Sequence, residues 1–511
     1  MVLALTLAGQ HPAYAQAYSG QLMEAVEITL RQDALIASAR QQIAASQGQL
    51  LSARAPFDRV WNAGVSRQRS NTPLPGSGGD SLAINQQSYS AGVSQLLESG
   101  VVVNPKISID RIQDIGANRT GPSTSNAALN ILIPLRKGAG IEINTAPVTA
   151  ASLTLEASRS SYRHTQASSV VQTATAYWDL VAARQSLDLA TQAQSRAELL
   201  LANARKLAGA DEIPKADLLK YDVRRIAQQA DRLRAVVQLG RAQQALSQAM
   251  NMPLEALQAA AATLDNFPAA SNARLGLLED AAAVARLMAG SADRRLDIRA
   301  AEQQLRAANT LADAARRNSS SQLDLGLSIG YSGLAEGRGG VSSLRALGNP
   351  ARGLNASVSL NYTLPDGAFE QRGLIQQRDA AAAQLQTSLE ALRLRAKVNA
   401  ATQLSALVLA IAQLDRVDAQ RRLQSTIYDN EKRSYQAGLS TLLDLFTTES
   451  QLTATQLQWV QVQRDFAQAL ALFRFQTATL LLPAPDEEQS STNIQLLPNS
   501  LTTLPLPGIY P

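Results

Sequence analysis

Apolar and polar residues alternate in two blocks of this chain, and long stretches with helical spacing separate the blocks. In the second block, apolar residues alternate with small or polar ones from 322 to 331 and again from 356 to 364. In the first block, residues 88–94 and 128–133 do the same. A period of two places the apolar side chains on one face of a strand. Such strands fit either a bilayer-spanning barrel, which needs about 9–11 residues per strand, or a half-buried antiparallel sheet.

Two stretches are predicted to form exceptionally long helices. Residues 150–207 contain neither proline nor glycine, and residues 368–437 contain only Gly373. At about 1.5 Å per residue, each helix extends on the order of 90–105 Å. Helices of this length are stable only when they pack lengthwise against partners. A shorter helix is expected over residues 22–55, and Pro56 ends it.

Each long helix ends at a glycine-containing turn, at 206–211 and at 435–440. Gly209 and Gly438 are expected at the C′ position with positive φ, where glycine carries no steric penalty. Ser440 or Thr441 would cap the following helix. Both turns therefore predict a helical reversal, or tip, at the end of the helices far from the strands.

The order of elements is the same in both halves, and the sequence itself repeats at a shift of 262 positions. A repeat of this length indicates a duplicated half-molecule rather than a solenoid. We expect a first half at 16–318 (helix 20–55, strand block 57–138, helices 139–318) and a second half at 319–481 (strand block 319–367, helices 368–481). The repeated residues are Ala39, Gln41, Gln42, Ala45, Ala53, Arg54, Gly64 and Ser66, which recur as Ala301, Gln303, Gln304, Ala307, Ala315, Arg316, Gly326 and Ser328.

The composition narrows the class of protein. Only 17% of residues are charged, which is low for a soluble helical protein, and no run of about 18 apolar residues predicts a membrane-spanning helix. A β-barrel remains as the membrane option.

Residues 1–15 are predicted to be a signal peptide, with an apolar run at 2–8 and an Ala-x-Ala site at 13–15, although the basic start is missing. Residues 482–511 are rich in Pro, Ser, Thr and Asn and are expected to be a disordered tail.

Few kinds of chemistry are available to this chain. It has no cysteine, and its two histidines are His11 and His164. Disulfides, thiol catalysis, a histidine metal site and a histidine-based triad are therefore not expected, and His164 is predicted to lie on a helix surface. The net charge of +5 is spread along the chain without aromatic interleaving, which does not favour nucleic-acid binding. We predict neither a cofactor nor an enzymatic activity.

Four sets of motifs recur in a fixed order along the chain. They are Ala174-Thr175-Ala176-Tyr177-Trp178, the second tip Tyr435-Gln436-Ala437-Gly438-Leu439 with Leu442-Leu443-Asp444-Leu445, the first tip Ala208-Gly209 with Ala216-Asp217-Leu218-Leu219, and the strand exits Ile133-Pro134-Leu135-Arg136-Lys137-Gly138 and Thr363-Leu364-Pro365-Asp366-Gly367. Each motif alone is weak, but their order, spacing and duplication are specific. Through these motifs, residues 20–481 resemble the TolC-like outer membrane factor (outer membrane efflux protein) family.

The resemblance implies a membrane α+β fold, in which a homotrimer forms one outer-membrane β-barrel that continues as a long periplasmic α-helical barrel. It implies an exit duct for a tripartite efflux pump or a type I secretion system of a Gram-negative cell. The partners would be outer-membrane lipid, a periplasmic adaptor (membrane fusion) protein and, through the adaptor, an inner-membrane transporter. The alternative is a periplasmic coiled-coil scaffold that does not insert in the membrane.

The resemblance also places candidate sites at the two tips. Asp217 and Asp444 would form rings of three carboxylates, or else act only as helix-start residues stabilised by the helix dipole. Thr447 stands where the family has a second aspartate, and Ser440 where it has an arginine. Lys215 and Tyr435 are candidates for a bond across the closed tip. The candidates for adaptor docking are Ala208, Gly209, Ala437, Gly438 and Leu439.

We expect two differences between the halves of the chain. The first strand block has an added hairpin, comprising residues 101–111 and 126–135, after a turn at Glu98-Ser99-Gly100. Two strands per half would give the family's twelve-stranded barrel, whereas an added hairpin in the wall would give eighteen strands. The hairpin could instead lie outside the membrane. The first tip is also expected to be two residues longer than the second, over 211–215.

Overall fold

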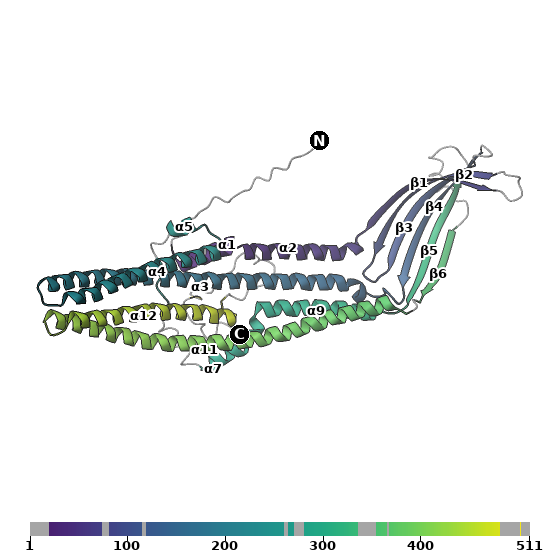
Figure 1. The fold of residues 1–511 in the computed structure, drawn as a ribbon. Helices are drawn as coiled ribbons and strands as arrows, with labels where there is room; N and C mark the ends of the chain where they lie inside the picture. The colour runs from purple at the N-terminus through teal and green to yellow at the C-terminus, as the bar shows by residue number, and fades with distance from the viewer. Residues whose placement is uncertain are drawn as a thin grey trace, which may run out of the picture. The chain divides into compact units, whose positions relative to one another are not determined.

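The computed structural model describes residues 20–73, 81–114, 119–259, 264–269, 281–335, 354–364, 367–480 and 501 (Figure 1). The expected signal peptide lies outside these residues, as does the expected C-terminal tail except Leu501. The chain divides into two compact units. The helical unit comprises Met1–Gln42, Arg159–Ala300 and Glu390–Pro511, and the sheet unit comprises Ile43–Ser158 and Ala301–Leu389.

The sheet unit contains one antiparallel sheet of six strands in the order β1-β2-β3-β4-β5-β6. The first and second halves of the chain meet where β4 pairs with β5, with Leu129 opposite Ile329. The second strand of the added hairpin was predicted over 126–135, but β4 begins seven residues earlier, at Arg119, and its backbone pairs with β3 and β5. The strands are β1 (Val60–Pro73), β2 (Ser81–Leu96), β3 (Val102–Asp114), β4 (Arg119–Pro134), β5 (Gln322–Ala335) and β6 (Leu354–Thr363).

The turn between β2 and β3 is held against the turn that leads from β4 into helix α3 (Ile141–Gly209). Gly140 donates its backbone N–H to the carbonyl of Ser99 at 3.1 Å. Gly100 has φ +92°, and a Cβ there would lie 2.2 Å from the carbonyl oxygen of Gly138. Only glycine fits both the left-handed backbone and this close approach.

Parts of four helices complete the sheet unit. α2 (Ala34–Arg54) contacts α3 through the hydroxyls of Ser46 and Ser158, 2.8 Å apart. α9 (Leu296–Arg317) contacts α11 (Phe369–Gln436) through an ion pair between Arg316 and Asp379, also at 2.8 Å. α3 begins nine residues before the predicted start at 150 and includes Pro147 within it. α11 agrees with the prediction to one residue at each end.

The predicted helix over 22–55 is two helices, α1 (Leu22–Gln32) and α2, separated at Asp33. Asp33 has an extended backbone, and its carboxylate accepts a hydrogen bond from the N–H of Leu35 at 2.7 Å. The freed carbonyl of Gln32 accepts from the side-chain amide of Asn251 at 3.0 Å. The break is stable because polar side chains satisfy both new helix ends.

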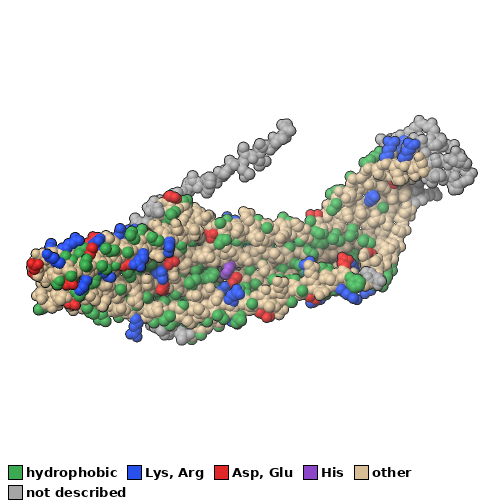
Figure 2. All heavy atoms as spheres, in the orientation of Figure 1, with side chains coloured by type: hydrophobic (Ala, Val, Ile, Leu, Met, Phe, Trp, Pro, Cys, Tyr) green, Lys and Arg blue, Asp and Glu red, His purple; other side chains and the backbone are tan. Residues whose placement is uncertain are grey.

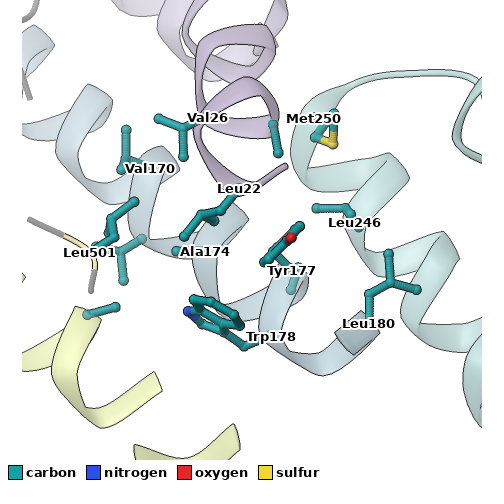
Figure 3. Close-up of a cluster of buried hydrophobic side chains, with 14 of the residues drawn as sticks. Leu22, Val26, Val170, Ala174, Tyr177, Trp178, Leu180, Leu246, Met250 and Leu501 are labelled. Carbon is teal, nitrogen blue, oxygen red and sulfur yellow. The ribbon is translucent and has the colours of Figure 1, made fainter. Parts of the chain in front are cut away.

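The core of the helical unit lies where α1, α3 and α4 (Leu218–Met250) meet (Figure 3). Tyr177 and Trp178 of α3 are fully buried there. The Tyr177 hydroxyl donates to the carbonyl of Gly20 and accepts from the N–H of Asp265, both at 2.8 Å. Ala174, one turn earlier, lets α1 approach closely, so that the hydroxyls of Thr29 and Thr173 lie 2.8 Å apart. The Ala-x-Ala-Tyr-Trp motif is therefore a packing motif.

A second core joins α11 to α12 (Leu442–Gln476), through Leu407 and Ile411 on one helix and Phe466 and Phe473 on the other. Among the described helices, α11 is the one long and apolar enough to cross a membrane by composition. That signal is weak, since core helices give it too, and 28% of the apolar window is buried inside the chain. The remaining helices of this unit are α5 (Leu254–Ala259), α7 (Ala281–Ala289) and α8 (Ser291–Arg294).

Candidate constriction and docking site at the helical tips

The second tip, between α11 and α12, is closed by a Schellman motif. The N–H of Leu439 donates to the carbonyl of Ser434 at 2.9 Å, and the N–H of Gly438 donates to that of Tyr435 at 3.0 Å. Gly438 has φ +74°, so the predicted C′ glycine is confirmed. Thr441 then caps α12.

The first tip, between α3 and α4, has the same motif on different residues. The N–H of Glu212 donates to the carbonyl of Leu207 at 2.9 Å, and Asp211 has φ +56°. Asp211 is therefore the C′ residue. The prediction that Gly209 is the turn glycine is wrong, because Gly209 is the last residue of α3 and does not have positive φ.

The Schellman motif at the first tip alters the residue-by-residue match between the two tips. Asp211 is equivalent to Gly438, and the spacing from Asp211 to Asp217 equals the spacing from Gly438 to Asp444. The expected insertion of two residues at 211–215 is therefore wrong, since it came from pairing Gly209 with Gly438. The equal spacing from the C′ residue instead supports the match of Asp217 with Asp444.

The two aspartates make different local contacts. Asp444 and Thr441 form a capping box, in which the N–H of Asp444 donates to the Thr441 hydroxyl at 3.2 Å and the N–H of Thr441 donates to Asp444 Oδ2 at 3.3 Å. Asp217 instead pairs with Lys220, with 2.7 Å between Nζ and Oδ1. The hydrogen bond to Asp217 raises the pKa of the Lys220 ammonium group. Both aspartates are thus helix-start residues, and a carboxylate ring remains a proposal.

The other three constriction candidates lie as follows. The Thr447 hydroxyl donates to the carbonyl of Leu443 at 2.9 Å, so within one chain it serves its own helix. Tyr435 packs in a hydrophobic cluster with Tyr221 and Leu442, which joins the two tips. In the described part of the chain no hydrogen bond links Lys215 to Tyr435, and Lys215 is exposed at the start of a 3₁₀ turn, Lys215–Asp217.

The docking candidates differ in exposure. Leu439 projects with 83% of its surface exposed, and Ala437 and Gly438 beside it are exposed as well. Ala208 is buried at 2% exposure, so its side chain offers no surface to a partner. Gly209 is exposed on the last turn of α3.

A buried polar contact between the tips was missed from the sequence. Arg196 on α3 donates to Glu449 Oε1 on α12 at 2.7 Å and to the Thr453 hydroxyl at 3.0 Å. The Glu449 side chain is 4% exposed. One turn of α12 away, the guanidinium of Arg224 on α4 lies 5.3 Å from the centre of the Phe446 ring. We call Arg196, Glu449 and Thr453 the tip latch. No motif predicts it, because its members come from opposite halves of the chain.

His164 lies on α3 and is more buried than the predicted helix-surface residue. Its ring is 5.5 Å from that of Phe475, and Nδ1 lies 3.9 Å from an oxygen of Asp297. Burial lowers the pKa of His164, and the nearby Arg295 lowers it further against the opposing effect of Asp297. His164 is therefore a half-buried helix residue, with 31% of its side chain exposed.

The two faces of the six-stranded sheet differ in polarity. One row of directly opposed residues crosses all six strands on what we call the apolar face: Ala63, Ala91, Ile107, Ala127, Tyr331 and Leu354. The adjacent row on the opposite, polar face begins with Gly64, Ser90, Ser108 and Asn126 and ends with Ser332. Four aromatic residues of the strands lie on the apolar face, Trp61, Tyr89, Tyr331 and Tyr362, and Asp324 lies on the polar face.

Residues 287–475 match the family model of outer membrane efflux proteins. No curated protein matches the chain. The outer-membrane channel OprN is similar in structure, with 16% identity, a TM-score of 0.67 and coverage of 90% of each chain. The outer membrane protein VceC from Vibrio cholerae has 15% identity and a TM-score of 0.63, covering 89% of this chain and 96% of its own. The open state of the Neisseria gonorrhoeae MtrE channel has 16% identity and a TM-score of 0.60, covering 90% and 89%.

The chain therefore shares the fold of these outer-membrane channels, which combines a sheet with long helical hairpins. The second half carries the sequence pattern of outer membrane efflux proteins, and the predicted resemblance to TolC-like outer membrane factors is confirmed. The predicted α+β fold is confirmed by the likeness in structure, and the family match of residues 287–475 supports the predicted outer-membrane location. The family is one of channels rather than enzymes.

Proposed function

We propose that this chain is the protomer of a homotrimeric channel-tunnel, the exit duct of a tripartite efflux pump or a type I secretion system. The observation that carries the proposal is the sheet, which has one apolar face, one polar face and two open edges. Every backbone polar group must be paired within a bilayer, so this sheet needs further copies to close a barrel. A periplasmic scaffold has no use for a broad apolar sheet face.

The helices also call for further copies of the chain. Exposed apolar residues follow one stripe of α4 and one of α11, both at the spacing of a coiled-coil contact. Lengthwise packing against neighbouring copies would cover these stripes and wall a tunnel. The stripe residues are Leu219, Val223, Ile226, Leu233 and Val237 on α4, and Leu394, Val398, Leu409, Leu423 and Ile427 on α11.

Cell fractionation combined with heat-modifiable gel migration tests this assembly. We expect the protein in the outer-membrane fraction, migrating as a trimer before heating and as a monomer after. A soluble periplasmic monomer would exclude the channel and favour the scaffold.

We propose that the tips form the constriction and the docking surface for a periplasmic adaptor. Leu439 projects from the second tip, and Figure 2 shows Lys and Arg side chains gathered over the region of α4, next to the first tip. An adaptor with apolar and acidic groups would complement both features. Since the chain has no cysteine, Leu439→Cys can be cross-linked selectively to an adaptor in vivo, with Ala208→Cys as the buried control. Equal cross-linking of both variants would refute docking at this surface.

A further inference from the structure

Six strands per chain raise the question of whether the added hairpin, β3 and β4, belongs to the barrel wall. The hairpin lies in the middle of the sheet, because β2 pairs with β3 and β4 pairs with β5. β2 and β5 are not neighbours. A hairpin lying outside the wall would have to leave the sheet and break both of these ladders.

The apolar face runs through the hairpin without interruption. Ile107 and Ile109 of β3 stand directly opposite Ala91 and Tyr89 of β2. At the end of the sheet far from α3, the apolar face of β1, β2 and β3 stops in a single row, where Arg67, Gln87 and Arg111 are direct neighbours. In β4 the change comes one pair earlier, at Ser125, which stands opposite Ile109.

The position of the apolar run drifts steadily across the sheet. We compare the centre of each strand's apolar run with the row of opposed residues that extends from Ala63 to Leu354. In β1 and β2 the centre of the run lies on this row. Its centre lies one residue toward the α3 end in β3, three in β4 and four in β5 and β6. The runs are Trp61–Val65, Tyr89–Val93, Val103–Ile109, Ala127–Ile133, Leu323–Tyr331 and Leu354–Tyr362.

A shift of this kind is expected when strands are tilted relative to the bilayer normal, because the bilayer then crosses successive strands at successively shifted residues. Four residues correspond to about 13 Å along a strand, and five strand spacings to about 24 Å, which gives a tilt of roughly 30°. The hairpin strands have the intermediate positions.

Both edges of the sheet can continue this pattern into another copy of the chain. β6 is exposed along its whole length. β1 runs away from the helices and β6 runs back toward them, so β1 of one copy would pair antiparallel with β6 of the next, like every other pair in the sheet. The apolar faces of the two edge strands would then also be continuous.

We infer that all six strands enter the wall and that three copies close an eighteen-stranded barrel. The inference rests on the proposed trimeric channel. At a strand tilt of 30–40°, eighteen strands give a backbone diameter of about 32–36 Å, against about 21–24 Å for twelve. The small residues Gly64, Ser90 and Ser108 on the polar face would leave most of that width to water.

Electron cryo-microscopy of the full-length protein in lipid nanodiscs tests the strand number directly. Eighteen strands in a wall shared by three chains are expected. A trimer with a twelve-stranded wall and the hairpin outside it would overturn the inference and leave the proposed function standing. Two chains closing twelve strands would also overturn it. A monomer without a barrel would remove the proposed function itself.

Cysteine labelling in vesicles tests the hairpin alone. Ser108→Cys on the polar face should react with a charged maleimide, whereas Ile107→Cys on the apolar face should react only with a lipid-soluble one. Their direct neighbours on β2, Ser90→Cys and Ala91→Cys, are the matched controls. Equal reaction of Ser108→Cys and Ile107→Cys with the charged reagent, while the β2 pair still differs, would place the hairpin in water and refute the inference.

Discussion

The tip latch gives the sharpest prediction about opening of the proposed duct. Arg196 connects α3 to α12 through Glu449 and Thr453, so separation of the two tips would break both of its hydrogen bonds. We expect Arg196→Ala to favour the open tip. Glu449 would be left with only Thr453, whose hydroxyl donates to it at 2.9 Å.

The free-energy cost of Arg196→Ala depends on how far the ion pair is buried. Removing one partner of a fully buried ion pair costs about 3–5 kcal/mol. The Arg196 side chain is 27% exposed, so water reduces the loss to about 2 kcal/mol, within the range for a hydrogen bond to a charged group. At 1.4 kcal/mol per tenfold change, the closed-to-open ratio should fall roughly 30-fold.

Single-channel recording of the trimer in planar bilayers measures this ratio as open probability and open-state conductance. Glu449→Ala and the double variant complete a mutant cycle, and the coupling between the two positions should account for most of the single-variant effect. Arg184→Ala is the control, because Arg184 pairs with Asp188 on the exposed surface of α3 and such pairs contribute at most about 1 kcal/mol.

Two results would refute the reasoning. Open probability unchanged in Arg196→Ala would show that the latch does not restrain the tip. An equal rise in Arg184→Ala would show that any loss of positive charge on α3 opens the channel. Thermal dissociation of the trimer, measured in parallel, separates a gating effect from a general loss of stability.

The remaining predictions concern local structure. Gly438→Ala should destabilise the second tip by about 1 kcal/mol because of its positive φ, whereas Gly209→Ala should be neutral or slightly stabilising; equal losses in trimer melting would contradict the assignment of C′ residues. Tyr177→Phe leaves a buried carbonyl and a buried N–H unpaired and should cost about 1–3 kcal/mol, seen as an earlier melting transition. Asp444→Ala should cost about 0.5–1.5 kcal/mol, because the N–H of Thr441 loses its acceptor in the capping box, and unchanged cation preference and divalent block would refute the carboxylate ring. Because burial lowers the folded pKa of His164, trimer stability should decline as pH falls below about 6.5, and the part due to this residue should vanish in His164→Gln.

The tips show where sequence reasoning failed and why. Glycine is the best predictor of a left-handed helix end, so Gly209 was assigned the role that Asp211 has in the structure. Aspartate tolerates the same backbone because its short polar side chain can hydrogen-bond locally. Only the bond from Glu212 to Leu207 identifies the residue that ends the helix, and this bond also corrects the correspondence of the two tips.

Some strands and helices could be predicted from the sequence, because they depend on short-range patterns. The period of two in β5 and β6 and the unbroken helical spacing of α11 express the intrinsic geometry of strands and helices. The break at Asp33 was missed because the interaction that stabilises it comes from Asn251, more than two hundred residues away.

The sequence by itself determined the duplicated order of helices and strands, the polarity of each strand face and the resemblance to TolC-like outer membrane factors. Tertiary structure alone decided that β3 and β4 stand between β2 and β5, and that Arg196 meets Glu449. The reason is physical: periodicity records how a segment is oriented toward apolar and polar surroundings, whereas strand order and ion-pair partners depend on which segments meet in space.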